Sequence, residues 1–246
     1  MQNTPRFLIA SSEINNSKFK IFDKSQINKI KQVLRMQSGN RIVLFDGVGT
    51  EYVCELEIVS SDVVTGNILE KNIIEQNAKF NITLAQGFPK AGKIEEIVRM
   101  CTEVGVSNFV FFESEYSLPK VKDYKENKIE RINKIIQEAT RQSERSSLPR
   151  ILELTSFNNL INKEETKTKI LLSTHKEQPT VNFSEIKLKL IEDNIKEVML
   201  IIGTEGGFSP KELHTAKEKG VIISEMKLPI LRTETAGVVA AGFLLI

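Results

Sequence analysis

The feature that most constrains the fold is an apolar run, Val198 to Ile202, which breaks into a glycine-rich turn and then into a helix. The helix start is marked by Ser209 as N-cap, Pro210 at the first helical position and Glu212 at the third, the pattern of a capping box. Glycines permit positive φ and carry no Cβ, and free N–H groups at a helix start hold polar ligand atoms. The order strand, turn, helix therefore predicts a place where the backbone comes close to a ligand.

The turn does not by itself identify a ligand. Its sequence, GTEGG at 203–207, lacks the Gly-Lys-Ser/Thr ending of a P-loop and the spacing of a dinucleotide fingerprint. It also lies near the C-terminus, whereas the glycine loop of a classical Rossmann fold follows the first strand. From this motif alone, a ligand site and an ordinary tight turn both stay open.

Length and composition favour a globular protein of one large domain or two smaller ones. The chain has 246 residues, of which 40% are hydrophobic and 27% charged. No apolar run approaches the roughly 20 residues that cross a bilayer, and the first residues lack the basic and apolar segments of a signal peptide. We therefore expect a cytoplasmic protein without a membrane segment.

Cysteine and histidine do not predict a metal site. Cys54 and Cys101 have no metal-ligand spacing, and we expect both to be buried as small apolar residues. His175 and His214 have no partners at metal-ligand spacing either. No metal is expected.

Charge is unevenly distributed along the chain. Residues 1–46 hold eight Lys and Arg against three Asp and Glu, and residues 116–150 hold nine against five, whereas residues 47–115 are acidic. Two separated basic regions are compatible with binding a phosphate backbone. A solvated lysine-rich surface explains the same counts, so charge permits RNA binding without establishing it.

The first part of the chain is expected to be a small β domain. Short strands are predicted at 41–45, 51–59 and 63–69, interrupted by a helical piece at about 25–36. The alternation within the second strand places four side chains on one face: Tyr52, Cys54, Leu56 and Ile58. The polar stretch at 71–79 is the expected boundary.

From about residue 81 strands and helices alternate, which indicates an α/β layer with parallel strands. Strands are predicted at 81–86, 108–114, 169–174, 198–202 and 221–228, and helices at 92–105 and 125–145. The last segment, at 233–246, is expected to be a buried core helix with Gly237, Ala240 and Ala241 on one close-packing face.

Two blocks together carry a resemblance. "IIGTEGGFS" at 201–209, followed by "LRTETAG" at 231–237, resembles the SPOUT RNA methyltransferases that modify uridine N3 in small-subunit ribosomal RNA. Further stretches that look like this family follow in the same order: "RF" at 6–7, "QVLRMQSGNRIVLFDGVGTEYVCEL" at 32–56, "AQGFPKAGKIEEIV" at 85–98 and "EATRQSERSSLPRI" at 138–151. The resemblance covers nearly the whole chain.

The resemblance implies a two-domain architecture. Residues 1–74 would form a PUA-like RNA-binding β-barrel, and residues 75–246 a SPOUT α/β domain whose C-terminal helix passes through a loop to make a trefoil knot. It further implies a homodimer that uses S-adenosyl-L-methionine and acts on 16S rRNA, in the assembled 30S subunit rather than as free RNA.

The resemblance also implies which residues form the site. The cofactor would be held by three loops, at Leu172, Ser173, Gly203, Glu205, Gly206, Gly207, Leu231, Arg232 and Thr233. The candidates for stabilising the uridine anion or accepting its proton are Arg232 and Glu234, and Arg145 is a weaker candidate. An alternative role for Glu234 is equally compatible with the sequence: a carboxylate in the first turn of the last helix, at the positive end of the helix dipole. RNA-contact candidates are Arg6, Arg35, Lys90, Arg141, Gln142 and Arg145.

Two positions depart from the family pattern. The stretch Met226 to Pro229 lacks a glycine that the family usually has before the third cofactor loop, and Tyr116 stands where the family typically has an arginine. These departures favour one alternative function, a non-catalytic RNA-binding assembly factor. A second alternative, ribose 2′-O methylation, stays open because it uses the same kind of cofactor fold.

Overall fold

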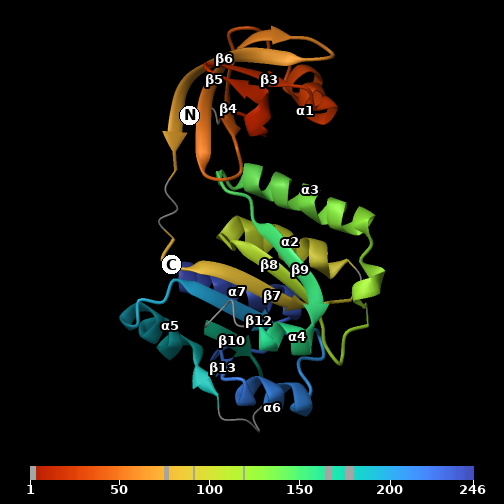
Figure 1. Cartoon of the computed structure of the whole chain (residues 1–246), viewed down its shortest axis with the longest axis vertical. Helices are drawn as coiled ribbons and strands as arrows, with labels where there is room; N and C mark the ends of the chain where they lie inside the picture. Colours follow the sequence, from red (N-terminus) through yellow and green to blue (C-terminus); the bar gives the residue numbers. More distant parts are fainter. Residues whose placement is uncertain (1–3, 75–77, 91, 119, 164–167, 175–179) are drawn as a thin grey trace. The chain divides into compact units, whose positions relative to one another are not determined.

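The computed structural model describes residues 4–74, 78–90, 92–118, 120–163, 168–174 and 180–246. The chain divides into two compact units (Figure 1). The first comprises Met1–Asn77 and Thr140–Leu148, and the second Ala78–Ala139 and Pro149–Ile246. The segment Thr140–Leu148, which the sequence analysis placed with the α/β part, packs with the first unit because its backbone is bonded to the turn that follows β4, at Gly47 and Gly49.

The first unit is built on a six-stranded sheet. Its order is β1-β4-β5-β6-β3-β2, with β1 parallel to β4 and the other pairs antiparallel. The strands are β1 Arg6–Leu8, β2 Ile14–Asn15, β3 Lys18–Ile21, β4 Arg41–Phe45, β5 Thr50–Val59 and β6 Val64–Ile73. The expected helical piece is α1, Lys24–Asn28, continued by a π-helical turn at Lys29–Val33, and a short 3-10 turn occupies Ser11–Glu13.

The expected apolar face of β5 ends before Ile58. Cys54 and Leu56 are buried in the core of the unit, but Ile58 is 52% exposed. The pairing with β6 is irregular between Leu56 and Ile58, where Glu57 has no partner residue on β6. Because such a bulge inserts one residue, it reverses the alternation of faces. Val59 packs against the core instead.

The second unit is built on a seven-stranded sheet in which every pair is parallel. Its order is β11-β13-β10-β12-β7-β8-β9. The strands are β7 Asn81–Gly87, β8 Asn108–Glu113, β9 Arg150–Ser156, β10 Thr168–Leu172, β11 Val181–Asn182, β12 Glu197–Ile202 and β13 Ile222–Glu225. The alternation of strands and helices therefore predicted the layer and the direction of its strands correctly.

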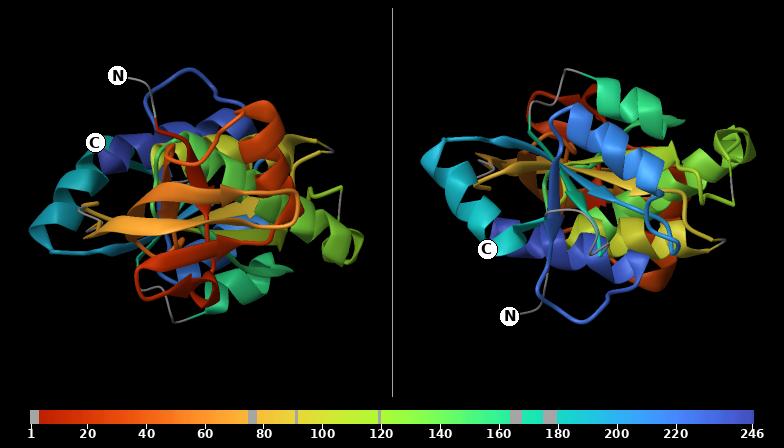
Figure 2. Two further views of the ribbon diagram at one scale, coloured as in Figure 1. Left: turned by 90° about the horizontal axis from the view of Figure 1, so that it is seen from above. Right: turned by 90° about the horizontal axis from the view of Figure 1, so that it is seen from below.

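Helices cover both faces of this sheet. They are α2 Lys93–Val104, α3 Glu126–Gln142, α4 Phe157–Asn162, α5 Phe183–Glu192, α6 Pro210–Glu218 and α7 Thr233–Leu245, with a 3-10 turn at Val121–Asp123. Figure 2 shows α7 on one side of the sheet and α4 and α6 on the other. Phe157 of α4 and Leu213 of α6 share one core cluster with Phe112 of β8. The opposite face carries α7 and α2, which pack against each other.

The C-terminal helix lies very close to the sheet. Gly237 faces Leu84 of β7, and a Cβ at Gly237 would come within 3.3 Å of both Leu84 methyl groups. Ala240 and Ala241 are also fully buried. The small residues of this segment therefore serve the close packing that the sequence predicted, and a larger side chain at Gly237 would separate α7 from β7.

The last strand of the sheet is shorter than expected. The sequence predicted a strand over 221–228, but β13 ends at Glu225. The Leu228 N–H bonds the Met226 carbonyl at 2.7 Å, which turns the chain away from the sheet before Pro229. Residues 226–232 consequently form a loop. Among the described residues, no helix has the length and apolar character to cross a membrane.

Candidate cofactor and catalytic site

A cavity of about 530 Å³ opens at the carboxyl ends of three adjacent strands in the second unit. Three loops surround it, one following each of β10, β12 and β13. In open parallel sheets ligands bind outside the carboxyl ends of the strands, because the connecting loops converge there. The volume lies in the range of small-molecule and cofactor sites.

All nine residues that the sequence analysis nominated for cofactor binding line this one cavity. They are Leu172, Ser173, Gly203, Glu205, Gly206, Gly207, Leu231, Arg232 and Thr233. Glu234, nominated for catalysis, lines it as well. Three stretches that are distant in sequence are therefore brought together by the strand order β13-β10-β12.

The glycine-rich turn after β12 has a conformation that larger residues would disturb. A Cβ at Gly203 would lie 3.0 Å from the backbone carbon and oxygen of Gly207, so the two segments of the turn meet without space for a side chain. Gly207 has a φ of 68°, in the left-handed region, and its N–H bonds the Thr204 carbonyl at 3.0 Å. The turn leads into α6, where Ser209, Pro210 and Glu212 form the expected capping box.

A buried hydrogen-bond network ties this turn to the start of α7. The Thr233 hydroxyl donates to the Gly203 carbonyl at 2.6 Å. The Gln86 amide nitrogen, fully buried at the end of β7, donates to the Thr233 hydroxyl at 2.9 Å and to the Gly203 carbonyl at 3.1 Å. Sequence reasoning nominated Thr233 but missed Gln86. The signal was an amide side chain at the end of a strand that is largely buried.

Lys93 is a second residue that sequence reasoning missed. It is the first residue of α2 and lines the cavity, and its Nζ lies 2.6 Å from Glu234 Oε1. Glu234 in turn lies 4.0 Å from the guanidinium of Arg232, which is 83% exposed. The hydrogen bond from Lys93 lowers the pKa of Glu234 below 4.5, and the same contact raises the pKa of Lys93.

This charge arrangement affects whether Glu234 can accept a proton from the substrate or serves only as a fixed carboxylate at the start of α7. A carboxylate whose pKa is lowered is a weak proton acceptor, because ionisation is already favoured by its partners. At neutral pH the ionised Glu234 carboxylate therefore lies beside two cations, Lys93 and Arg232, and Glu205 also contributes a carboxylate to the cavity lining. The two cations can stabilise negative charge that develops on a bound substrate.

The altered third loop also lines the cavity. Met226, Leu228, Pro229 and Ile230 all contribute to its wall, between β13 and the start of α7. Leu228 and Ile230 are 52% and 85% exposed, so this wall is apolar and open to solvent. The missing glycine has therefore not closed the cavity.

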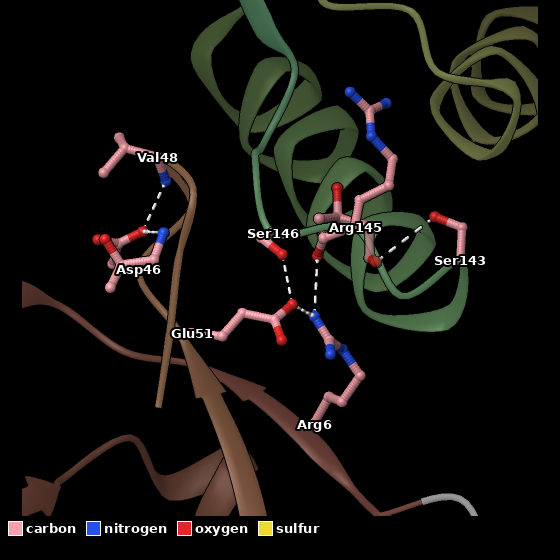
Figure 3. Close-up of polar contacts among 9 residues, drawn as sticks. Arg6, Asp46, Val48, Glu51, Ser143, Arg145 and Ser146 are labelled. Carbon is pink, nitrogen blue, oxygen red and sulfur yellow. Dashed lines mark hydrogen bonds and ion pairs between the residues drawn. The ribbon is translucent and has the colours of Figure 1, made fainter. Parts of the chain in front are cut away.

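Arg6, nominated for RNA contact, is engaged inside the first unit. Its guanidinium lies 2.5 Å from Glu51 and donates to the Arg145 carbonyl at 3.3 Å (Figure 3). The same guanidinium lies over the Phe45 ring. The Ser146 hydroxyl donates to the same Glu51 oxygen. Burial would raise the pKa of Glu51, but the hydrogen bonds from Arg6 and Ser146 and the Arg6 charge lower it.

The other nominated RNA contacts differ in exposure. Arg35 is exposed and follows the π-helical turn, with a φ of 51°. Arg141, Gln142 and Arg145 lie in or just after the end of α3, within the segment that packs with the first unit. Arg145 is half-buried, and burial lowers its pKa to about 10. It does not line the cavity of the second unit.

Lys90 belongs to the second unit and is exposed. Its backbone N–H bonds the Glu205 carboxylate at 3.1 Å, which places it beside the glycine-rich turn. Tyr116, the second departure from the family pattern, lies near it and is 46% exposed.

Both cysteines are buried, as the sequence indicated, and the histidine that the structure describes is exposed. Cys54 and Cys101 are buried, and burial raises the pKa of both thiols to about 12. His214 is exposed on α6, 3.3 Å from Glu218, whereas His175 lies outside the described residues. Across the described ranges, no group of three or more His, Cys, Asp or Glu side chains is placed to hold a metal ion.

Two family models match the chain. Residues 76–245 match an RNA methyltransferase domain, and residues 17–69 match an RNA methyltransferase PUA domain. The ribosomal RNA small subunit methyltransferase E of Bacillus subtilis is 31% identical over 215 residues, which cover 86% of this chain and 83% of that protein. The protein of the same name from Synechocystis is 31% identical over 218 residues, covering 88% and 69%.

Solved structures show the same fold. A probable rRNA methyltransferase from Porphyromonas gingivalis superposes with a TM-score of 0.81 at 25% identity, covering 98% of both chains. The ribosomal RNA small subunit methyltransferase E of Neisseria gonorrhoeae, solved with S-adenosyl methionine, has a TM-score of 0.83 at 23% identity, covering 98% and 97%. The fold is thus that of the SPOUT methyltransferases, preceded by a PUA-like β domain, and the chain belongs to the ribosomal RNA small subunit methyltransferase E family.

Proposed function

We propose that this protein transfers a methyl group from S-adenosyl-L-methionine to N3 of a uridine in 16S rRNA of the small ribosomal subunit. One observation carries the proposal: the nine residues nominated for cofactor binding, from three separate loops, line a single cavity. The family to which the chain belongs gives the cavity its chemistry, because its members are named as small-subunit rRNA methyltransferases.

The residues present fit this cofactor. A Cβ at Gly203 would meet the Gly207 backbone, and Gly203, Gly206 and Gly207 can present only backbone to the cavity that they line, as a site that binds through main-chain groups requires. Leu172, Ser173 and Leu231 complete the wall that would hold the cofactor, with Arg232 and Thr233 at the start of α7. When bound, the cofactor supplies a methyl group already activated on a sulfonium, so placing the acceptor in line provides much of the rate acceleration.

Uridine N3 must lose its proton, which solvent water can accept, before or during attack on the methyl group. Negative charge then spreads to O2 and O4, and the chain's own residues must stabilise it. Arg232, exposed at the cavity mouth, is the residue we assign to stabilising that charge, with the Lys93 ammonium beside it. Glu234 holds Lys93 in place, and its lowered pKa favours this role over accepting the proton.

RNA binding is assigned to both parts of the chain. Residues 1–74 would act as the PUA-like RNA-binding domain and residues 75–246 as the methyltransferase domain. Arg35, Arg141, Gln142 and Arg145 are the proposed contacts outside the cavity-bearing unit, and Lys90 is the proposed contact beside the cavity. The enclosed ion pair of Arg6 supports a mainly structural contribution from that residue.

Further properties of the family are proposed for this chain on the resemblance. They are a trefoil knot through which α7 passes, a homodimer, activity on the assembled 30S subunit in the cytoplasm, and catalysis without a metal ion. The knot rests on the resemblance alone, and the buried small residues of α7 serve its close packing on α2 and β7.

The decisive experiment is methyl transfer from labelled S-adenosyl-L-methionine to unmodified 30S subunits, followed by nucleoside mass spectrometry of the rRNA. We expect 3-methyluridine, with the Arg232→Ala variant strongly reduced in rate although folded by circular dichroism. A 2′-O-methylated nucleoside would assign the chain to ribose methylation instead. RNA binding without any methylated product would identify a non-catalytic assembly factor.

A further inference from the structure

A second, shallow pocket adjoins the cofactor cavity within the second unit. Its lining includes Lys90, Glu115, Tyr116 and Leu118, and it shares Glu205 and Gly206 with the cavity. One short stretch of the glycine-rich turn therefore separates the two spaces. A molecule in the second pocket would lie beside whatever occupies the first.

We propose that this pocket binds an unpaired base of the RNA substrate, stacked on the ring of Tyr116. The inference rests on the proposed function and specifies the acceptor side of the same site. Unpaired bases are recognised in proteins chiefly by stacking on aromatic side chains and by hydrogen bonds to their edges. The Tyr116 ring can supply the stacking contact, and the carboxylates of the pocket can accept hydrogen bonds from the edge of the base.

The position of the Tyr116 ring depends on glycine at 206. A Cβ at Gly206 would lie 3.2 Å from the Tyr116 Cβ and 3.3 Å from a ring carbon, so the root of the ring packs directly on the turn. The residue is nevertheless 46% exposed, and neighbouring Leu118 is 74% exposed. The Tyr116 ring is thus fixed near its Cβ but open to solvent, and an exposed aliphatic side chain lies beside it. Such a surface can bind the flat face of a planar ligand.

The turn that carries Tyr116 is held rigidly. The Ser114 N–H bonds the Ser117 hydroxyl at 3.0 Å, and the Ser117 N–H bonds the Ser114 carbonyl at 3.1 Å. The Glu115 N–H bonds one oxygen of the buried Glu212 carboxylate at 2.9 Å. The other Glu212 oxygen accepts from the Ser209 N–H at 2.9 Å. One carboxylate thus ties the Tyr116 turn to the start of α6, and little ordering remains to be done when a base binds.

The charges in the pocket favour a base over a phosphate. Glu115 and Glu205 both line it and would repel an anion, whereas their oxygens can accept N–H groups at the edge of a nucleobase. Lys90 provides the positive charge that an adjoining phosphate would contact, and its backbone already bonds Glu205 at 3.1 Å. A planar neutral ring with N–H donors is the ligand that matches both the ring and the carboxylates.

Kinetics on unmodified 30S subunits test the assignment. We expect Tyr116→Ala to lower kcat/KM for the subunit about tenfold or more, since a base–aromatic stack contributes at this scale. The affinity for S-adenosyl-L-methionine, measured by calorimetry, should change less than about twofold, and Tyr116→Phe should restore most of kcat/KM because it keeps the ring. Unchanged kcat/KM in Tyr116→Ala, or an equal loss in Tyr116→Phe, would overturn the proposal.

A binding measurement keeps this test separate from the proposed function. The chain contains no tryptophan, so Tyr116→Trp introduces a single tryptophan at the pocket, whose emission can be excited apart from that of the tyrosines. Leu152→Trp, at a position on β9 that is 55% exposed and lines neither space, is the matched control.

Added hexauridylate, with S-adenosylhomocysteine present, should quench the tryptophan fluorescence of Tyr116→Trp saturably and that of Leu152→Trp only weakly. Equal quenching in both, or none in the first, would overturn the pocket assignment even if the wild type methylates rRNA. Selective quenching without any methyl transfer would support the pocket and reject the proposed function.

Discussion

The ammonium of Lys93 and the carboxylate of Glu234 meet at 2.6 Å and join the first residue of α2 to the first turn of α7. Glu96 also lies 3.5 Å from the Lys93 ammonium. The pair stands at the rim of the cofactor cavity, and only 8% of the Glu234 side chain is exposed. It therefore both fixes the start of α7 and orients a cation toward the space where a substrate would be methylated.

The pair predicts an acid dependence of stability. The pKa of Glu234 is lowered on folding from its ordinary value of 4.5, so its stabilisation is present above that value and is lost as the pH falls through the lower, folded pKa. We expect Glu234→Gln to reduce the free energy of unfolding in urea at pH 7. The difference from the wild type should shrink only below about pH 4.5. Glu130→Gln, at an exposed position of α3, is the control and should show no such difference. A difference that vanished near neutral pH would contradict the lowered pKa.

Gly203→Ala should damage both folding and cofactor binding. The added methyl would meet Gly207 backbone atoms at 3.0 Å, and backbone cannot move aside as a flexible side chain can. We expect a loss of about 1–3 kcal/mol in unfolding free energy, as for other overpacking changes, and weaker binding of S-adenosyl-L-methionine by calorimetry. Gly242→Ala in α7 adds the same methyl where nothing lies within 4 Å. It should leave stability unchanged or slightly raised, since alanine favours a helix. Equal effects of the two substitutions would refute the close approach.

Thr233→Val removes a hydroxyl without changing the shape of the side chain. It should cost about 1–2 kcal/mol of stability, because Thr233 donates to the Gly203 carbonyl and accepts from the buried Gln86 amide. Thermal unfolding with and without S-adenosyl-L-methionine measures this loss and any accompanying loss of ligand stabilisation. Thr235→Val, two residues further along α7, is the matched control and should be nearly neutral. An unchanged Tm in Thr233→Val would show that the network contributes nothing to stability.

Arg6 and Arg35 should respond differently to truncation. Arg6→Ala leaves Glu51 without its ion-pair partner, where the two side chains are only 12% and 16% exposed. Breaking a buried pair in this way costs about 3 kcal/mol or more. Arg35→Ala should change stability by less than about 0.5 kcal/mol, because the side chain is exposed, but it should weaken binding to 30S subunits. Urea unfolding and a filter-binding assay separate the two effects. A stable Arg6→Ala variant with lost RNA affinity would assign Arg6 to RNA contact.

Much of the second unit was predictable from the sequence because its signals are local. The run Val198 to Ile202 and the capping box at Ser209 each depend on neighbouring residues, and both appear where expected. Gly207 has a positive φ that few other residues adopt, and Gly203 allows the close approach of Gly207, so glycines at these places in a turn could be anticipated. The resemblance then identified the three loops, and the order of the parallel strands explains why they meet.

The contacts that fill the site could not be predicted in this way. Gln86 and Thr233 are 147 residues apart, and Lys93 and Glu234 are 141 apart. Nothing near Lys93 in the sequence indicates that its side chain pairs with Glu234. Likewise, the sequence predicted an RNA contact at Arg6 but could not predict that its guanidinium pairs with Glu51, which also accepts from Ser146. The bulge at Leu56 to Ile58 arises from pairing with β6, which a pattern along β5 alone does not contain.

The sequence by itself determined the alternation of strands and helices in the second unit, the glycine turn with its helix start, and the family to which these blocks are similar. Those features follow from φ preferences, capping and apolar periodicity, which act over a few residues. Only the tertiary structure decided which charges pair, which of the nominated residues are enclosed, and that Tyr116 lies against Gly206 beside the cavity. These depend on segments brought together by the sheet, because hydrogen bonds, ion pairs and van der Waals contacts act only over a few ångströms in space, whatever the separation in sequence.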